Sequence, residues 1–340
     1  MLKVAIIGLG TVSPIHIMAI QDMVEAGRVE FVGACDINPD RADKLPEGVP
    51  FYTDVATLLA EAKPDAVHTC LPHDLHGPIG RQVLEAGCHL FTEKPLCHTL
   101  TDAENLVAAA KAHPDQVAAV CFQNRLNPCS VELKRRIDSG EDGAVLGIRA
   151  HVYWDRDAGY YAAEPWRGKI HRAGGGTLIN QAIHTLDLMQ YFVGAIPKTL
   201  NAVTSQIGEI MPGVEVEDSA MARMDFPNDV YGFYTSTNVA GTNYPVEVVV
   251  RCEKADYYLR GTELLRECSD REDAVCVSRD RKFTGEKFYY GMSHSLMIQA
   301  FYDAIEGKDS PIVPVEEGLA SLRMIDAIFR SSLSGRKVDV

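Results

Sequence analysis

The stretch KVAIIGLGTVSP, residues 3–14, joins a short apolar run to a glycine turn and then to a proline. The run from Val4 to Ile7 has the β-branched composition of a strand. Gly8 and Gly10 stand in the pattern G-x-G-x-x-S, one substitution away from the dinucleotide-binding pattern G-x-G-x-x-G/A. Pro14 suits the first turn of a helix, because that position needs no backbone N–H donor. The stretch therefore predicts a strand, a tight turn and a helix, which is the opening of a Rossmann fold.

Each part of this turn has a physical role toward a dinucleotide. The first glycine permits the tight turn, and the second lets a pyrophosphate approach the backbone at a helix N-terminus. Asp36 ends the next strand-like run, where it would accept hydrogen bonds from the adenosine ribose and repel a 2′-phosphate. We therefore predict NAD in preference to NADP. Arg41 is the opposing signal, since an arginine nearby can hold that phosphate.

The secondary-structure pattern changes near residue 123. Residues 1–123 alternate strand and helix patterns, which predicts a doubly wound parallel sheet with helices on both faces. One helix in this part is expected to begin at Thr101, with Glu104 completing a capping box. Residues 124–340 contain long strand-like runs and one strong helix, which predicts an α+β domain with a mostly antiparallel sheet. This second domain is expected to serve substrate binding and oligomerisation, with its final helices free to pack back on the first.

Composition and charge exclude several classes of partner. Lys and Arg number 33 against 47 Asp and Glu, a net charge of −14, which argues against nucleic acid or an anionic membrane surface. The sequence has no apolar run near the length of a membrane span. Nine scattered cysteines form no C-x-x-C pair, which indicates neither a disulfide framework nor a zinc ribbon. We expect a soluble, cytoplasmic protein.

A second informative stretch is HLFTEKPL, residues 89–96, in which a strand pattern ends at Lys94 and Pro95. In an open α/β sheet, ligands bind at the carboxyl edge of the parallel strands. Lys94 is therefore expected to point into the cleft that holds the nicotinamide. The alternative is a surface turn with a solvated lysine.

Four motifs occur in a fixed order along the chain: GxGxxxxxH at 8–16, CLPHDLH at 70–76, EKP at 93–95 and GGGTLINQAIHTLD at 174–187. With these motifs the chain resembles the Gfo/Idh/MocA family of sugar and polyol oxidoreductases. The resemblance implies a Rossmann domain followed by a domain with a large open sheet, often used to form a homodimer or homotetramer. It also implies hydride transfer between NAD(P) and a carbohydrate or cyclitol carbon.

The resemblance further gives residues their expected roles. It makes Lys94 the catalytic base, or a donor to the reacting hydroxyl, and it implies a cis bond between Lys94 and Pro95. The residues expected to bind the cofactor are Gly8, Gly10, Thr11, Val12, Asp36, Leu71, Pro72, His76, Glu93 and Lys94.

The helical stretch at residues 180–194 supplies the rest of the proposed chemistry. His184 and Asp187 are three residues apart and Asn180 is four residues before His184, so all three are expected on one helix face. Many family members have aspartate at the position of Asn180, and an amide cannot stabilise an ammonium as a carboxylate does. The lysine amine is therefore expected to be neutral, which is the form a general base needs.

Lys94 and His184 are accordingly predicted to handle the proton, without a decision as to which takes it from the hydroxyl, and Asn180 is predicted to position groups by hydrogen bonding. The alternative for His184 is a core histidine. Asp187, outside the catalytic set, is expected to fix the histidine tautomer or to cap a loop.

Residues 153–172 are rich in tyrosine, tryptophan and arginine, which suit the apolar faces and hydroxyls of a sugar. The alternative is packing against the sheet or an oligomer interface. The predicted substrate-binding residues are Tyr161, Trp166, Arg167, Lys169 and Asn124. His73 and His76 form an H-x-x-H pair without further ligands at useful spacing, so no metal site is expected. His294 is left open between a substrate contact and a surface residue.

The predicted function is an NAD-dependent dehydrogenase acting on a small carbohydrate or polyol. One alternative retains NAD tightly and oxidises a glycoside to a keto-glycoside, so that the cofactor is recycled within the site. Another alternative is a non-catalytic regulator that senses NAD.

Overall fold

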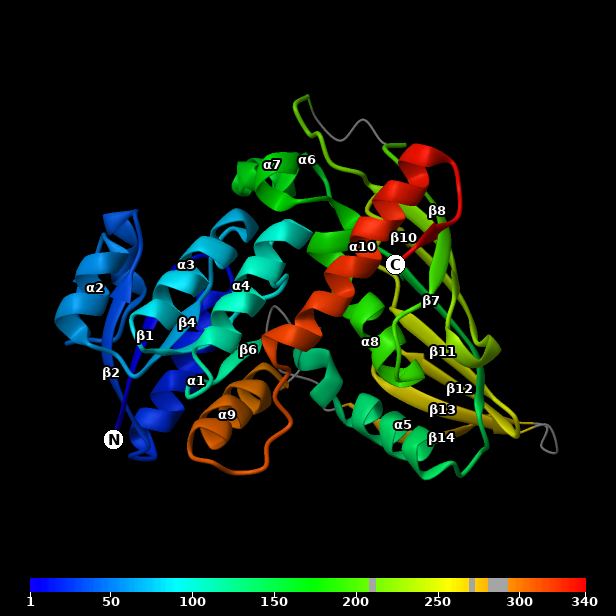
Figure 1. Ribbon diagram of the computed structural model, residues 1–340, viewed down its shortest axis with the longest axis horizontal. Helices are drawn as coiled ribbons and strands as arrows, with labels where there is room; N and C mark the ends of the chain where they lie inside the picture. Colours follow the sequence, from blue (N-terminus) through cyan, green and yellow to red (C-terminus); the bar gives the residue numbers. More distant parts are fainter. Residues whose placement is uncertain (208–211, 269–272, 281–292) are drawn as a thin grey trace. The chain divides into compact units, whose positions relative to one another are not determined.

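The computed structural model describes residues 1–207, 212–268, 273–280 and 293–340. These residues form two compact units (Figure 1). Unit one contains residues 1–123 and 293–319, and unit two contains the described parts of 124–292 together with 320–340. Residues 293–319, which the sequence-based division assigns to the second domain as helices able to pack back, thus belong to unit one.

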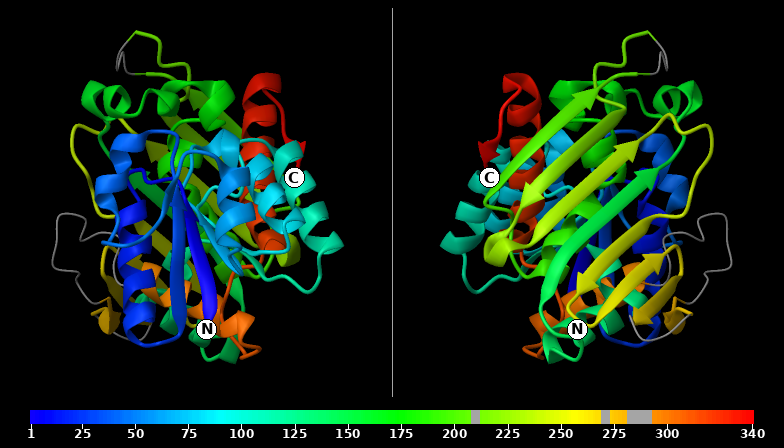
Figure 2. Two further views of the ribbon diagram at one scale, coloured as in Figure 1. Left: turned by 90° about the vertical axis from the view of Figure 1, so that its left-hand side faces the viewer. Right: turned by 90° about the vertical axis from the view of Figure 1, so that its right-hand side faces the viewer.

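Unit one is built on a six-stranded sheet in the order β3-β2-β1-β4-β5-β6, and every strand pair in it is parallel. Helices lie on both faces, with α1 against α9 and α3 against α4 (Figure 2, left). The predicted doubly wound parallel sheet is confirmed. Its elements are β1 (Leu2–Ile7), α1 (Ser13–Glu25), β2 (Val29–Cys35), η1 (Pro39–Lys44), β3 (Phe51–Tyr52), α2 (Val55–Ala62), β4 (Ala66–Thr69), α3 (His73–Glu85), β5 (His89–Thr92), α4 (Leu100–Ala112), β6 (Ala118–Val120), α9 (Ser293–Ile305) and the start of α10 (Val315–Ser334).

The start of α4 corrects one expectation. Thr99, not Thr101, caps this helix: its side-chain oxygen accepts the backbone N–H of Asp102 at 3.2 Å. Thr99 has the extended backbone of an N-cap residue, whereas Thr101 already lies inside the helix. Two threonines two residues apart offer competing caps, and the sequence pattern favours the wrong one.

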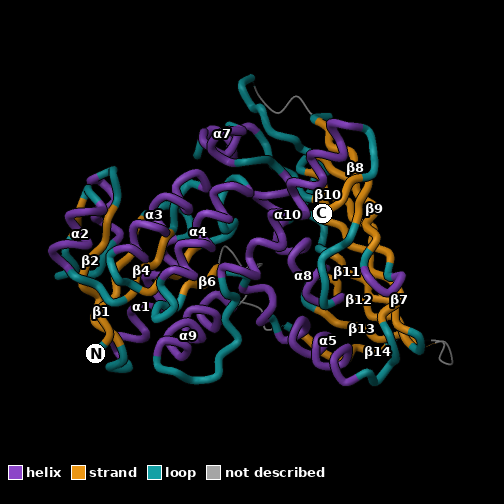
Figure 3. The backbone as a smooth tube through the Cα atoms, in the orientation of Figure 1, coloured by secondary structure: helices purple, strands orange, loops and turns teal. Residues whose placement is uncertain are grey.

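Unit two is built on a nine-stranded sheet in the order β14-β13-β12-β11-β7-β10-β9-β8-β15 (Figure 3). Its strand pairs are antiparallel except for β7 and β10, so the predicted mostly antiparallel sheet is confirmed. Its strands are β7 (Val145–Tyr153), β8 (Thr199–Ser205), β9 (Ser219–Asp225), β10 (Tyr231–Thr237), β11 (Glu247–Cys252), β12 (Ala255–Arg260), β13 (Glu263–Cys268), β14 (Val275–Arg279) and β15 (Val338–Asp339). Its helical elements are η2 (Gln123–Leu126, from its second residue), α5 (Pro128–Ser139), α6 (Ala158–Ala163), η3 (Pro165–Gly168), α7 (Ile170–Ala173), η4 (Thr177–Gln181), α8 (Ile183–Val193), η5 (Pro227–Asp229) and the rest of α10.

The two faces of the nine-stranded sheet differ. Helices α5 and α8 pack on one face, and Ser331 of α10 bonds to the backbone of β8 there. Among the described residues, no helix covers the face seen in the right-hand view of Figure 2. Val203, Met221 and Phe233 are each more than half exposed on its strands. Within the described residues, no helix is long and apolar enough to cross a membrane.

Candidate active site

The Gly8–Gly10 turn has the geometry that a pyrophosphate requires. Gly8 has a φ of +93°, and a Cβ added there would lie 2.3 Å from the carbonyl oxygen of Cys70, so only glycine fits. A Cβ on Gly10 would meet no heavy atom nearer than 3.8 Å, which leaves room for a ligand against the backbone. Helix α1 follows with no side-chain cap and no acidic residue in its first turn. These features fit a dinucleotide phosphate at the helix N-terminus.

Asp36 lies where the sequence predicts, directly after β2. Its carboxylate accepts the backbone N–H of Leu9 at 2.7 Å and the Arg41 guanidinium at 3.1 Å. Lys44, which sequence reasoning missed, donates from Nζ to the carbonyl oxygen of Leu9 at 2.5 Å. Asp36 and Lys44 therefore fix the backbone N–H and the carbonyl of Leu9 in the turn. Arg41 lies beside Asp36, the acid predicted to bind the ribose.

The loop after β4 is tied to the EKP segment through His76. Its Nδ1 lies 2.6 Å from the carbonyl oxygen of Pro95, and its Nε2 lies 2.9 Å from that of Leu71. His76 is fully buried and burial lowers its pKa, so the ring is neutral and donates its single N–H to one of these two carbonyls. Leu71 and Pro72 are thereby held close in space to Pro95, and their contact with the cofactor stays a prediction.

Lys94 follows β5 at the carboxyl edge of the parallel sheet, the same edge at which the Gly8–Gly10 turn follows β1. The Lys94–Pro95 bond is cis, as the family resemblance implies. The backbone N–H of Lys94 donates to Oε2 of Glu93 at 3.2 Å, and the lysine side chain is half-buried. This edge is where an open α/β sheet binds its ligand.

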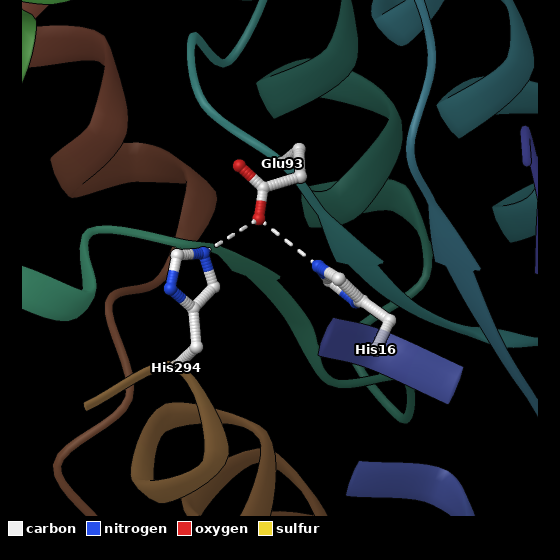
Figure 4. Close-up of side chains that lie close together, drawn as sticks. All are labelled: His16, Glu93 and His294. Carbon is white, nitrogen blue, oxygen red and sulfur yellow. Dashed lines mark hydrogen bonds and ion pairs between the residues drawn. The ribbon is translucent and has the colours of Figure 1, made fainter. Parts of the chain in front are cut away.

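Glu93 is the centre of a buried cluster (Figure 4). Its Oε1 lies 3.0 Å from Nε2 of His16 in α1 and 3.3 Å from Nε2 of His294 in α9. Burial alone would raise the pKa of Glu93, but the hydrogen bonds from the two histidines outweigh it and hold the pKa well below the ordinary value. Glu93 is therefore an anion. Sequence reasoning left His294 open, and it lies in this cluster rather than on the surface.

Asn180 does not share a regular helix with His184, which corrects the expectation of a common helix face. Asn180 belongs to the π-helical turn η4, and α8 begins only at Ile183. Gly176 precedes this turn, and only glycine fits there, because a Cβ would fall 1.9 Å from the carbonyl oxygen of Glu217. Such π turns alter the spacing of side chains, so the four-residue rule does not apply across them.

Glu217 holds this turn in place. Its two carboxylate oxygens accept the backbone N–H groups of Gly176 at 2.8 Å and Leu178 at 3.0 Å. Burial raises the pKa of Glu217 to about 7, although these backbone hydrogen bonds act in the opposite direction. The position of Asn180 thus depends on a carboxyl group that no sequence motif indicates.

Asp187 has neither of the roles expected for it. Its two oxygens accept Nε and Nη2 of Arg125 at 2.8 and 2.7 Å, and both side chains are buried. Arg125 also lies 4.8 Å from the centre of the Tyr191 ring. This pair ties the segment after Gln123 to α8, the helix that carries the half-buried His184.

The predicted substrate-binding residues differ in their burial and in their hydrogen-bond partners. Tyr161 is only 3% exposed, so its ring packs in the interior of unit two. Lys169 is engaged by Glu215 at 2.8 Å, and Trp166 donates from its indole to Glu164 at 3.2 Å.

Tyr160, which sequence reasoning missed, is the residue of this segment that reaches Asn180. Its hydroxyl donates to Oδ1 of Asn180 at 3.3 Å and accepts from Nε2 of Gln181 at 2.7 Å. The Arg167 guanidinium lies 4.4 Å from the centre of its ring. Asn124 lies in η2.

A glycine turn at a helix N-terminus, an acid after β2 and a lysine at the same sheet edge define a dinucleotide-dependent oxidoreductase. Residues 2–120 match the family described as "Oxidoreductase family, NAD-binding Rossmann fold", and residues 130–258 match the "GFO/IDH/MocA C-terminal domain". The chain belongs to the Gfo/Idh/MocA oxidoreductase family, and its N-terminal fold is the NAD-binding Rossmann fold of that family.

Named relatives agree with this assignment. The chain is 26% identical to D-glucoside 3-dehydrogenase of Escherichia coli, covering 100% of this chain and 97% of the relative. It is 29% identical to inositol 2-dehydrogenase 1 of Saccharopolyspora erythraea, covering 99% and 96%. Among solved structures, the WlbA dehydrogenase of Chromobacterium violaceum in complex with NADH and UDP-GlcNAcA is similar, with a TM-score of 0.86, 26% identity and coverage of 100% and 96%.

Proposed function

We propose that the protein transfers a hydride between NAD and a hydroxyl-bearing carbon of a sugar, a sugar derivative or a cyclitol. The observation that carries the proposal is Lys94, which follows β5 at the same edge of the parallel sheet as the Gly8–Gly10 turn. A similar chain is named for a glucoside and another for inositol, and a similar structure holds UDP-GlcNAcA, which supports a carbohydrate-like substrate.

In the oxidative direction, bound NAD supplies the hydride acceptor. The carbinol carbon loses a hydride and its hydroxyl loses a proton, so a carbonyl forms together with NADH and one released proton. Lys94 and His184 handle this proton, and Asn180 positions groups by hydrogen bonding. Because Asn180 is uncharged it does not stabilise an ammonium, which favours the neutral amine that a general base needs.

The substrate side is proposed to involve Trp166, Arg167, Lys169 and Asn124. Tyr160 joins them because its hydroxyl contacts Asn180. Tyr161 is proposed to act from the interior, where its ring meets that of Tyr160 edge to face at 5.1 Å.

Self-association as a homodimer or homotetramer is part of the proposal. It is supported by Val203, Met221 and Phe233, three exposed apolar residues on adjacent strands of the nine-stranded sheet, since apolar side chains exposed close together mark interfaces. Light scattering on the eluting protein would detect the assembly, and a monomer at all concentrations would contradict it.

The test of function is a panel of sugars, cyclitols and glycosides incubated with NAD, read by NADH absorbance and by mass spectrometry of the products. Release of NADH with a stoichiometric carbonyl product supports the dehydrogenase. A keto-glycoside formed with protein-retained NAD and no net NADH would favour the recycling enzyme. NAD binding without any product would favour a regulator.

A further inference from the structure

A chain of buried polar side chains extends from Glu93 into the interior of unit one. Its five members are at most 5% exposed: His16 in α1, His68 in β4, Glu93 after β5, and His294 and Tyr302 in α9. Buried polar groups are costly unless they are hydrogen-bonded. Because one member of this cluster, Glu93, immediately precedes the candidate catalytic Lys94, we asked what the cluster does for that lysine.

The first half of the chain determines the state of Glu93. The Nε2 atoms of His16 and His294 both approach Oε1, at 3.0 and 3.3 Å, as Figure 4 shows. An ionised carboxylate only accepts hydrogen bonds, so both rings present an N–H at Nε2. A hydrogen bond from His16 and an ion-pair contact of His294 thus account for the convergence of three side chains that could otherwise suggest a metal site.

The second half continues through His68. Its Nδ1 lies 2.9 Å from Nδ1 of His16, and its Nε2 lies 2.7 Å from the hydroxyl of Tyr302. Burial lowers the pKa of His68 well below its ordinary value, so the ring is neutral and carries one N–H. Burial also raises the pKa of Tyr302, so the phenol keeps its proton. Because a hydroxyl can donate or accept, Tyr302 satisfies His68 in either tautomer.

We propose that His294 and Tyr302 of α9, acting with His16 and His68, are positioning residues for Lys94. They hold the Glu93 anion in one orientation, with Oε1 bound by imidazoles and Oε2 left to fix the backbone N–H of Lys94 at 3.2 Å. The inference rests on the proposed function only in naming Lys94 as the catalytic group. Under this proposal, helix α9, which lies about 200 residues after Lys94 in the chain, helps to position the catalytic lysine.

The variants that test the inference are Glu93→Gln, His294→Gln and Tyr302→Phe. The matched control is Arg28→Gln, because Arg28 anchors the far end of α9 through Asp303 and Glu306. Its charge lowers the pKa of the Tyr302 phenol, so the substitution raises that pKa further and leaves the phenol protonated. On a substrate found in the panel, we expect kcat to fall on the order of 10-fold for His294→Gln, with KM and NADH affinity nearly unchanged. The fall in kcat should be larger for Glu93→Gln, and NADH affinity should fall as well, because Glu93 is also a predicted cofactor contact. The acidic limb of the kcat profile should move to lower pH in Glu93→Gln, since removing an anion favours a neutral amine.

A second readout needs no turnover. After reductive ¹³C-methylation, the NMR signal of Lys94, identified by its absence in Lys94→Arg, should titrate about 0.5 pH unit or more away from wild type in Glu93→Gln and His294→Gln. The control should titrate as wild type does. If no sugar is oxidised, the proposed function fails, while this titration still decides whether the cluster controls Lys94.

Three results would overturn the inference. One is a Lys94 titration and kcat profile that are the same in wild type, His294→Gln and Tyr302→Phe. Another is an equal loss in Arg28→Gln, which would indicate only that α9 must be stable. The third is one equivalent of zinc or iron retained through dialysis against a chelator and lost in His294→Gln, which would make the cluster a metal site.

Discussion

The buried pair of Arg125 and Asp187 offers a direct test of how unit two holds α8. The two side chains are 6% and 1% exposed and are joined by two hydrogen bonds of 2.7 and 2.8 Å. Removing one partner leaves an uncompensated buried charge, which costs about 3–5 kcal/mol, whereas replacing both by apolar residues is often neutral. The cation–π contact with the Tyr191 ring stabilises an Arg125 guanidinium left without its partner by about 2 kcal/mol, because the site is desolvated. We therefore expect Asp187→Asn to destabilise unit two by about 3 kcal/mol, and Arg125→Met with Asp187→Leu to lie within about 1 kcal/mol of wild type.

Urea unfolding followed by tryptophan fluorescence is the assay, since Trp154 and Trp166, the protein's two tryptophans, both lie in unit two. Glu263→Gln is the control, because its partner Arg279 is 70% exposed and such pairs contribute at most about 1 kcal/mol. The reasoning is refuted if Asp187→Asn costs no more than this control. It is also refuted if the double variant is as unstable as the sum of the single ones.

Three further predictions concern the cofactor turn and the π turn. Gly8→Ala should weaken NADH binding in a fluorescence titration at least about 10-fold, because its Cβ meets the Cys70 carbonyl at 2.3 Å and its positive φ adds about 1–2 kcal/mol of strain. Wild-type affinity in that variant would contradict the account. Asp36→Asn should raise NADPH affinity relative to NADH about 10-fold or more, since it removes a charge-assisted bond from Arg41 and the repulsion of a 2′-phosphate. An unchanged ratio would argue against this role of Asp36. The folded protein raises the pKa of Glu217 from 4.5 to about 7, so as pH rises this carboxyl group ionises in the unfolded chain before it ionises in the folded one. Between pH 4.5 and 7, wild-type unit two should therefore lose about 3 kcal/mol of unfolding free energy that Glu217→Gln does not lose. Parallel pH curves of the two urea midpoints would disprove this contribution.

Local rules were sufficient for much of the fold. The glycine turn, the acid after β2 and the alternating strands and helices predict the parallel sheet because each depends on residues within a few positions. The long strand-like runs after residue 123 likewise predict the mostly antiparallel sheet. The order in which these strands pair, β12 to β14 included, is not predicted, since pairing is set by neighbouring strands.

The parts of the site that sequence reasoning missed depend on distant partners. The π turn around Asn180 is held by Glu217, which binds the backbone N–H groups of Gly176 and Leu178 about 40 positions earlier. Asp187 binds Arg125, and His294 reaches Glu93, over still larger separations. Helical spacing carries no information about such contacts, so Asn180 was assigned to the wrong helix geometry and Asp187 to the wrong role.

The most direct measurement is the rate of NADH formation by Lys94→Ala on the best substrate of the panel, at saturating NAD, alongside NADH binding. We expect NADH affinity to be largely retained in Lys94→Ala while turnover falls to background, and the turnover of His184→Ala to fall about 10²–10⁴-fold. Turnover by Lys94→Ala at the wild-type rate would contradict the claim that this lysine handles the proton.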